Sequence, residues 1–235
     1  IPSSVKKIEE NAFKGCINLK TISIPDSVNI IPAGCFNGCI ELTKVELPST
    51  ITKISNDAFS NCCNLIDILI SDVVTEIGSS AFHNCSNLCK IQIPDSVIEI
   101  GPSAFEGCRS LESINLSQKI KYINCNTFRG CELLNKIWIP KNVAIIGSEA
   151  FGGCENMSIV AIQSNHIKID PTAFLQCSNI SRLYLANNNP NVVISSFGDS
   201  IAIKIISPIS DYDRIKSSAS TSAEDLYKTH ATNLK

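Results

Sequence analysis

The sequence has no run of basic residues and no apolar run long enough to cross a membrane. Its 20 Lys and Arg residues against 22 Asp and Glu residues give a formal charge of −2. The positive patch of a nucleic-acid-binding protein is therefore missing. Apolar stretches are short, such as Ile201 to Ile206, which Lys204 interrupts, whereas a spanning helix needs about 20 apolar residues. We expect neither nucleic-acid binding nor a membrane span in this chain.

Motifs that carry catalysis are also missing. The sequence contains no H-E-x-x-H, no G-x-S-x-G, no phosphate-binding loop and no dinucleotide-binding fingerprint. The only histidines are His83, His166 and His230, too far apart in the sequence to complete a zinc site with the cysteines. We therefore predict no catalytic residues, no metal site and no cofactor, because an enzyme needs convergent titratable groups that this sequence does not show.

What the sequence has is a repeat of 23 residues without insertion. Phenylalanine recurs at that period, at Phe13, Phe36, Phe59, Phe82, Phe105, Phe128, Phe151 and Phe174. Cysteine follows three residues later each time, at Cys16, Cys39, Cys62, Cys85, Cys108, Cys131, Cys154 and Cys177. The chain starts at the first position of a coil, so the first coil's numbers serve as repeat positions. A single coil is too small to fold alone, so stability must come from coils stacked on one another.

Each coil predicts a set of short elements. The stretch from Leu19 to Ile24 has the form L-x-x-L-x-L, whose alternation indicates a strand with Ile22 and Ile24 inside. A proline such as Pro25 ends that strand, and Val5 to Ile8 predicts a second short extended piece. The spacing from Ala12 to Cys16 predicts one helical turn. The residue before the column cysteine, Gly in five coils and Asn in two, predicts a left-handed corner.

The repeat also sets the domain boundaries. We predict a solenoid over residues 1–207, with eight coils over 1–184 and a degenerate ninth over 185–207. After Pro208 the repeat stops, and the pattern from Ser222 to Leu234 predicts a helix. We interpret 208–235 as a C-terminal cap, the alternative being a frayed or partner-binding tail. Nothing comparable protects Ile1, and no Met or leader precedes it, so further coils are expected upstream.

The template I-P-x-S-V-x-x-I-x-x-x-A-F-x-x-C-x-x-L-x-x-I resembles the leucine-rich repeat of BspA-like proteins, also called the Treponema-type repeat. The resemblance is strong from Ile1 to about Tyr184 and weak to about Ser207. It implies an α/β repeat solenoid, a right-handed superhelix with a parallel β-sheet on its concave face and short strands and helical turns on the convex side. It also implies a surface or secreted protein that adheres to host, matrix or cell-surface proteins. His166 at position 5, and Cys35 and Thr127 at position 12, depart from the template.

The twelve cysteines invite a disulfide or zinc interpretation, which the repeat weakens. Eight of them occupy one repeat position, where a small apolar residue suits a stacked core. The other four, Cys35, Cys63, Cys89 and Cys125, fall at four different positions and cannot form a second column. We favour a column of buried thiols over disulfides or metal, and expect Cys63 and Cys89 to be exposed.

The outward side chains of the main sheet form what we call the outer row, which comprises repeat positions 21 and 23. Unlike the core positions these vary, as a binding surface free of packing constraints should. The candidate partner-binding residues on this row are Lys44, Glu46, Leu69, Lys90, Gln92, Lys136, Trp138, Arg182 and Tyr184. Trp, Tyr and Arg dominate binding hot spots, which draws attention to Trp138 and Tyr184. The alternatives are an ordinary solvated face or aromatic rings folded down against neighbouring strands.

We therefore predict a non-enzymatic, monomeric protein-binding module at the cell surface or outside the cell. Its ligand would be a host, matrix or cell-surface protein. The alternative is a cytoplasmic leucine-rich-repeat scaffold or inhibitor, which the abundance of thiols favours. A thiol count on the native protein and the upstream sequence would separate these hypotheses.

Overall fold

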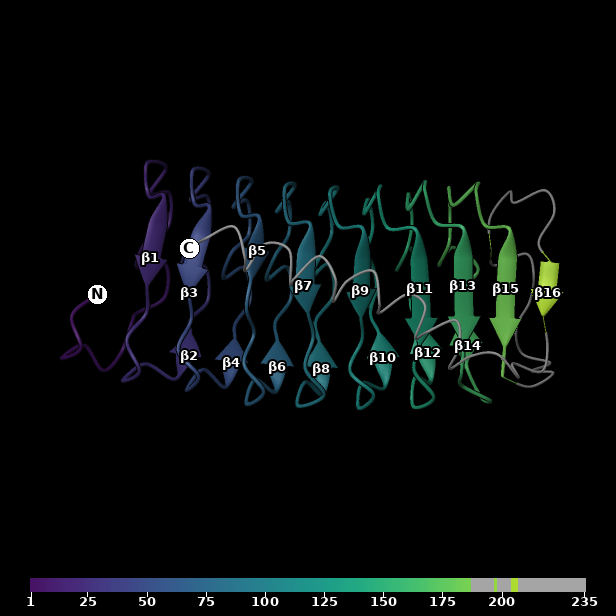
Figure 1. Cartoon of the computed structure of the whole chain (residues 1–235), viewed down its shortest axis with the longest axis horizontal. Coiled ribbons are helices and arrows are strands. Elements are labelled where there is room, and N and C mark those ends of the chain that lie inside the picture. The colour runs from purple at the N-terminus through teal and green to yellow at the C-terminus, as the bar shows by residue number, and fades with distance from the viewer. Residues whose placement is uncertain (187–196, 198–203, 207–235) are drawn as a thin grey trace, which may run out of the picture.

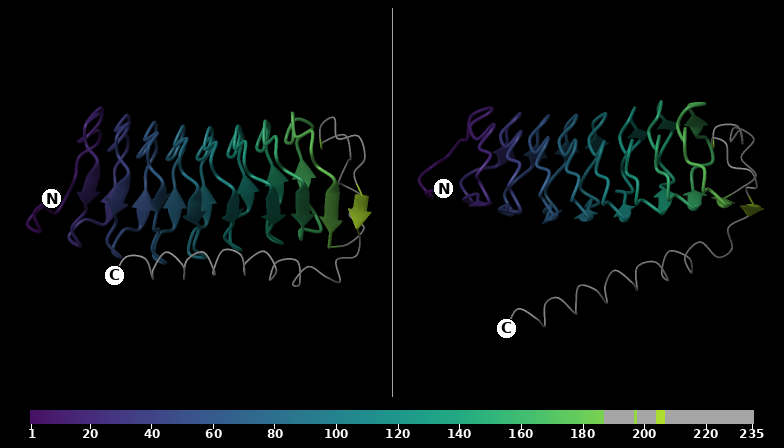
Figure 2. Two further views of the ribbon diagram at one scale, coloured as in Figure 1. Left: turned by 45° about the horizontal axis from the view of Figure 1, so that its top comes forward. Right: turned by 90° about the horizontal axis from the view of Figure 1, so that it is seen from above.

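The computed structural model describes residues 1–186, 197 and 204–206, and shows a parallel β-solenoid. Its coils lie side by side along one long axis (Figure 1), and the same order is seen from two further directions in Figure 2. Each coil gives one strand to a main sheet, which comprises β1 (Thr21–Ser23), β3 (Lys44–Glu46), β5 (Asp67–Ile68), β7 (Lys90–Gln92), β9 (Ser113–Asn115), β11 (Lys136–Ile139), β13 (Ile159–Ile162), β15 (Arg182–Leu185) and β16 (Lys204–Ile206). The opposite side carries shorter strands, namely β2 (Ile30–Ile31), β4 (Lys53–Ile54), β6 (Glu76–Ile77), β8 (Glu99–Ile100), β10 (Tyr122–Ile123), β12 (Ile145–Ile146) and β14 (Lys168–Ile169).

The register of the strands follows the repeat. Thr21 pairs with Lys44 in the main sheet, and Ile30 pairs with Lys53 on the opposite side, 23 residues apart in each case. The main sheet is hydrogen-bonded in three parts, β1-β3, β5-β7-β9 and β11-β13-β15-β16. The predicted stack of coils with parallel sheets is confirmed. No helix in the described part of the chain is long and apolar enough to cross a membrane.

The phenylalanine column forms the centre of the core. Adjacent rings from Phe13 to Phe174 lie 5.0–5.5 Å apart between centroids, with interplanar angles of 2–13°. This is an offset-stacked arrangement, which aromatic pairs favour over a direct sandwich. Phe36 and the later rings of the column are fully buried, while Phe13 in the first coil is half-buried. The separation between rings also gives the spacing of the coils, a little over 5 Å.

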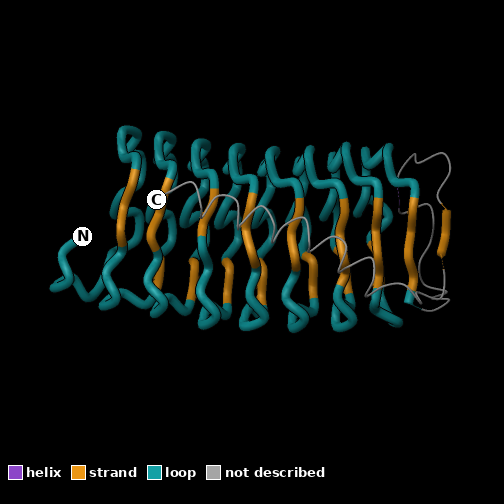
Figure 3. The backbone as a smooth tube through the Cα atoms, in the orientation of Figure 1, coloured by secondary structure: helices purple, strands orange, loops and turns teal. Residues whose placement is uncertain are grey.

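The helical turn predicted at Ala12 to Cys16 is not formed, and no α-helix is present among the described residues (Figure 3). The N–H groups of repeat positions 12, 14 and 16 bond within their own coil, as in Lys14 N to Asn11 O at 3.0 Å. Those of positions 11, 13 and 15 donate instead to the next coil, as in Phe13 N to Cys35 O at 2.9 Å. Alternate N–H groups therefore point in different directions, which a helix does not allow. The segment is a series of turns that tie one coil to the next.

Residues with a left-handed backbone conformation, that is a positive φ, produce this alternation in the direction of the N–H groups. Position 15 has a positive φ in all eight coils, including Gln176 with φ 62°, so the predicted corner is confirmed. A second left-handed site at position 11 was not predicted. It begins with Asn11 at φ 59° and recurs in the next six coils, the last being Glu149 at φ 48°. Only glycine adopts this region without strain, and Asn or Asp is tolerated better than other residues.

The column cysteines are held by hydrogen bonds as well as by packing. From Cys39 to Cys177, each thiol donates to the carbonyl oxygen of the phenylalanine in the preceding coil, with Sγ to O distances of 3.0–3.2 Å. A buried carbonyl gains a second donor in this way, and the weak S–H donor is satisfied. Cys16, in the first coil, is exposed. The twelve cysteines all lie among the described residues, and most of them are buried.

This arrangement predicts two classes of thiol reactivity. Under native conditions a thiol reagent should label exposed Cys125 quickly and half-buried Cys63 and Cys89 more slowly. The eight buried cysteines should react only after unfolding. Mass spectrometry of the labelled protein, with and without urea, gives both counts. Rapid labelling of Cys85 or Cys108 in the folded protein would contradict the buried column.

Local departures from the template are absorbed without breaking the stack. At position 5, His166 is exposed and the next residue, Ile167, is buried in its place. In the degenerate ninth coil, Phe197 stacks on Phe174 at 4.7 Å, and β16 pairs in parallel with β15. The predicted helix and cap over 208–235 lie outside the described residues.

Candidate functional site

The outer row changes character along the main sheet. On β3, β7 and β9 both outward positions are exposed, for example Lys90 and Gln92 on β7. On β11 and β13 the outward positions are largely covered: Lys136 is half-buried, Trp138 is 9% exposed and Ala161 is 1% exposed. Strand alternation places these side chains on the same face. The open part of the row therefore lies over the first half of the solenoid.

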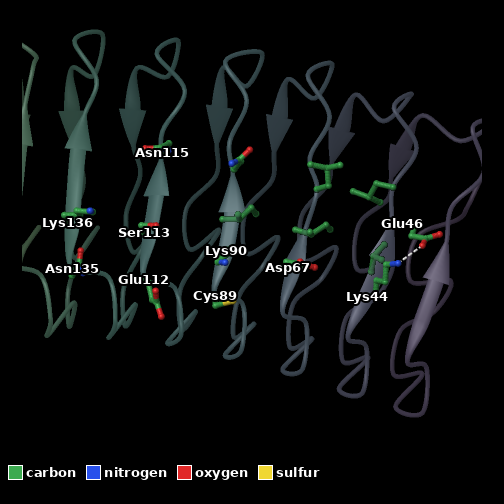
Figure 4. Close-up of a pocket in the computed structure, with 16 residues that line it drawn as sticks. Lys44, Glu46, Asp67, Cys89, Lys90, Glu112, Ser113, Asn115, Asn135 and Lys136 are labelled. Atoms are coloured by element: carbon green, nitrogen blue, oxygen red, sulfur yellow. Dashed lines mark hydrogen bonds and ion pairs between the residues drawn. The ribbon is translucent and has the colours of Figure 1, made fainter. Parts of the chain in front are cut away.

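A hollow of about 470 Å³ lies over the exposed strands, from β3 to β11 (Figure 4). Six of the nine predicted binding residues line it, namely Lys44, Glu46, Leu69, Lys90, Gln92 and Lys136. Further polar lining comes from Asp67, Cys89, Glu112, Ser113, Asn115 and Asn135. Three of these, Asp67, Ser113 and Asn115, belong to the outer row by their repeat positions. Cys89, Glu112 and Asn135 stand at position 20, which the period-two pattern does not assign to the outer face.

Only some of the charged side chains in the hollow form contacts with one another. Lys44 Nζ bonds Glu46 Oε1 at 2.8 Å; this hydrogen bond lowers the pKa of Glu46 and raises the pKa of Lys44. The amine of Lys136 lies 5.5 Å from the centroid of the Trp138 ring, within reach of a cation–π contact. Charged side chains that neutralise each other inside a site offer little to a partner, so the remaining charges of the hollow matter more for recognition.

The aromatic pair on the outer row takes the alternative placement, with its rings folded down against neighbouring strands. Trp138 is 9% exposed, and its Nε1 atom is buried without a hydrogen-bond partner among the described residues. Ala161 lies between Trp138 and half-buried Tyr184 in the register of β11, β13 and β15. The small alanine leaves room for rings on either side, as expected of side chains folded against neighbouring strands. Arg182 is exposed on β15. The residues that line the hollow do not include Trp138, Arg182 or Tyr184.

A second group of charges lies at the turn edge of the coils. Arg129 bonds Glu106 at 3.0 Å and Glu149 at 2.7 Å, and these hydrogen bonds raise the pKa of Arg129. His83 Nδ1 lies 3.8 Å from Glu106. These ion pairs lie at the surface with Glu106 half-buried; surface pairs contribute about 0–1 kcal/mol each, and we interpret this cluster as a link between neighbouring coils. Within the described ranges, no group of three or more His, Cys, Asp or Glu residues is arranged to hold a metal ion.

The chain is similar to known leucine-rich repeat proteins in both sequence and fold. The family model described as BspA type leucine rich repeat region matches residues 1–112 and 98–226. A leucine-rich repeat protein of T. pallidum is 31% identical over 67% of this chain and 76% of its own, with a TM-score of 0.62. A leucine-rich repeat protein from Bacteroides ovatus is 23% identical, with a TM-score of 0.61, over 85% of this chain.

A third solved structure, the pneumococcal vaccine antigen PcpA, is 18% identical over 82% of this chain, with a TM-score of 0.53. The chain covers 64% of the Bacteroides protein and 64% of PcpA, just under two thirds of each. At these identities the two structures show the shared fold alone. No match is found among curated proteins.

Proposed function

Because the chain belongs to the BspA-type leucine-rich repeat family, we propose that it is a non-enzymatic protein-binding module whose ligand contacts the hollow over β3 to β11. The observation that carries the proposal is the contrast between core and outer row. The phenylalanine and cysteine columns of the core keep one residue in eight successive coils, whereas the outer row changes between neighbouring coils, as from Lys44 to Asp67 to Lys90, and these residues line one hollow. A surface that mixes polar and apolar side chains and extends over the strands from β3 to β11 suits a macromolecular ligand.

The site of action that we propose is the cell surface or the extracellular space, with a host, matrix or cell-surface protein as the ligand. This rests on the resemblance of the repeat to BspA-like proteins. An intracellular scaffold or inhibitor is the second candidate, and the column of buried thiols from Cys39 to Cys154 favours it because secreted proteins of modest size often form disulfides. Labelling of intact source cells with a membrane-impermeant reagent separates the two, since only a surface protein is labelled before lysis.

Binding through the hollow is tested with a matched pair of variants. The hollow variant is Leu69→Ala with Lys90→Ala. The control is Ile98→Ala with Lys121→Ala, which also removes one exposed aliphatic side chain and one exposed lysine, next to β8 and β10 on the opposite side. We expect the hollow variant to lose at least about tenfold in affinity, roughly 1.4 kcal/mol, for immobilised matrix proteins or cells. The control should bind as the wild type does.

Both variants should keep the thermal midpoint of the wild type, because surface substitutions usually change stability by less than about 0.5 kcal/mol. Equal binding by the hollow variant and the wild type would remove the hollow from consideration. If the wild type binds no matrix protein and no cell surface in this assay, the adhesive role is wrong.

A further inference from the structure

The charged side chains of the hollow alternate in sign from coil to coil. Asp67, Lys90 and Lys136 at repeat position 21, and Glu112 one residue earlier in its coil at position 20, come from four successive coils and line the same hollow (Figure 4). No ion pair within 4.0 Å joins any of these four to another described residue, whereas neighbouring Lys44 is already bonded to Glu46. Asp67 and Lys90 are direct partners in the register of β5 and β7. The hollow thus presents four charges in the order negative, positive, negative, positive.

The spacing of these charges is set by the stack of coils. Ring centroids of the column are 5.3 Å apart for Phe59 and Phe82, 5.4 Å for the next pair and 5.5 Å for Phe105 and Phe128. Three coil steps separate Asp67 from Lys136, and the three ring spacings together give a span of about 16 Å. A ligand that opposes all four charges must present side chains at this same interval.

An α-helix has the required interval. Side chains at i, i+4, i+7 and i+11 lie along one face, and 11 residues at about 1.5 Å each span about 16.5 Å. An extended peptide has same-side residues about 6.7 Å apart, so it falls out of step with the coils after one repeat. The geometry of the hollow favours a helix lying along the solenoid axis over a strand in the same direction.

We propose that the hollow binds an α-helix of the partner protein that carries Glu, Lys, Glu and Lys at i, i+4, i+7 and i+11. These would face Lys136, Glu112, Lys90 and Asp67 in that order. Glu placed four residues before Lys also stabilises the helix itself. Leu69, 73% exposed and two residues after Asp67, offers an apolar contact at the end of the helix. This inference rests on the proposed function and specifies its ligand.

The probe is a capped, alanine-based helical peptide of about 20 residues that carries these four charges. The matched control peptide has the same composition with the order Glu, Glu, Lys, Lys, which places like charges opposite Glu112 and Lys90. Circular dichroism checks that the two peptides are equally helical, and fluorescence anisotropy at low salt measures binding to the whole chain. We expect the alternating peptide to bind at least tenfold more tightly and to weaken as salt is added.

A charge swap tests the register. Lys90→Glu should weaken the alternating peptide at least tenfold, and a peptide with Lys in place of the Glu at i+7 should recover the affinity. Lys121→Glu, on the opposite side, should change nothing. Equal binding of the alternating and control peptides, binding of neither, or no recovery on the swap would overturn the helix proposal.

The same experiments separate this inference from the proposed function. If the peptides fail while Leu69→Ala with Lys90→Ala still abolishes binding to matrix proteins or cells, the hollow is a binding site and the helix is wrong. If that variant binds matrix proteins and cells as the wild type does, the hollow itself is wrong, and any binding of the peptide is adventitious.

Discussion

Raising the pH above 9 is expected to unfold this protein steeply, because folding keeps many of its thiols protonated. Burial removes the thiolate from water and raises the pKa of these groups; that of Cys35 rises to about 12. The cysteines with a raised pKa are Cys35, Cys39, Cys62, Cys85, Cys108, Cys131 and Cys154. All seven side chains are fully buried.

The sign follows from proton binding in the two states. In the unfolded chain these thiols ionise near their ordinary value of 9.0, so above that pH the unfolded state holds fewer protons than the folded state. The free energy of unfolding then falls as pH rises, by up to about 1.4 kcal/mol per pH unit for each thiol. Below about pH 8 the effect is absent. With seven thiols acting together the loss over one unit is comparable to the whole stability of a typical domain.

Urea unfolding in the presence of a reductant, repeated between pH 7.5 and pH 10, measures this slope. Cys108→Ala should lower stability at every pH but reduce the slope by about a seventh, since one of the seven linked protons is removed. Cys125→Ser, which changes an exposed thiol outside the column, should leave the slope unchanged. A slope that Cys108→Ala does not alter, or a flat profile up to pH 10, would show that the buried thiols do not govern alkaline stability.

The stack of coils could be predicted from the sequence because the period is uninterrupted. The core columns that begin at Ile8, Phe13 and Cys16 each repeat at an interval of 23 residues. Because this interval is fixed, neighbouring coils can stack in only one register that brings equivalent positions together. The corner at position 15 was also predictable, since glycine or asparagine occupies it in seven coils. Strand pairing such as Thr21 with Lys44 then follows from the same interval.

The turns between the strands were not predictable in the same way. A spacing of three between Phe13 and Cys16 suits a helical turn as well as successive β-turns, and the choice depends on bonds to the next coil. The left-handed site at position 11 has a sequence signal in Asn11, Gly34 and Asp57. In later coils the same position holds Ser80, Ser103 and Glu149, which are residue types that do not indicate a left-handed conformation. Hydrogen bonds between coils stabilise these residues in a conformation that their local preference disfavours.

The outer row was predictable as a face, but its division into open and covered parts was not. Alternation along a strand assigns Lys90, Gln92 and Trp138 to one side. Whether an aromatic ring points into solvent or packs against the sheet depends on the neighbouring side chains. Trp138 is buried next to the small Ala161, which is a tertiary effect. The hollow arises because Lys90 and Gln92 have no such covering.

Phe105→Ala should cost about 3–5 kcal/mol in the free energy of unfolding, among the largest losses of any single truncation in the core. Phe105 is fully buried and stacks on Phe82 and Phe128, 5.4 and 5.5 Å away. Removing its ring opens a cavity in the middle of the column and ends two stacking contacts at once. In a solenoid each coil is stabilised mainly by its neighbours, so the defect weakens both interfaces of that coil.

The matched control is Phe13→Ala, at the same repeat position in the first coil. In a protein made of these 235 residues, Phe13 is half-buried and stacks on Phe36 alone, so its loss should cost about half as much or less. Phe105→Leu keeps most of the buried volume and should recover part of the stability. Urea unfolding followed by circular dichroism measures all three variants. If Phe105→Ala and Phe13→Ala cost the same, the column does not act through contacts on both sides of each ring, and the stability of the stack must come chiefly from the hydrogen bonds between its coils.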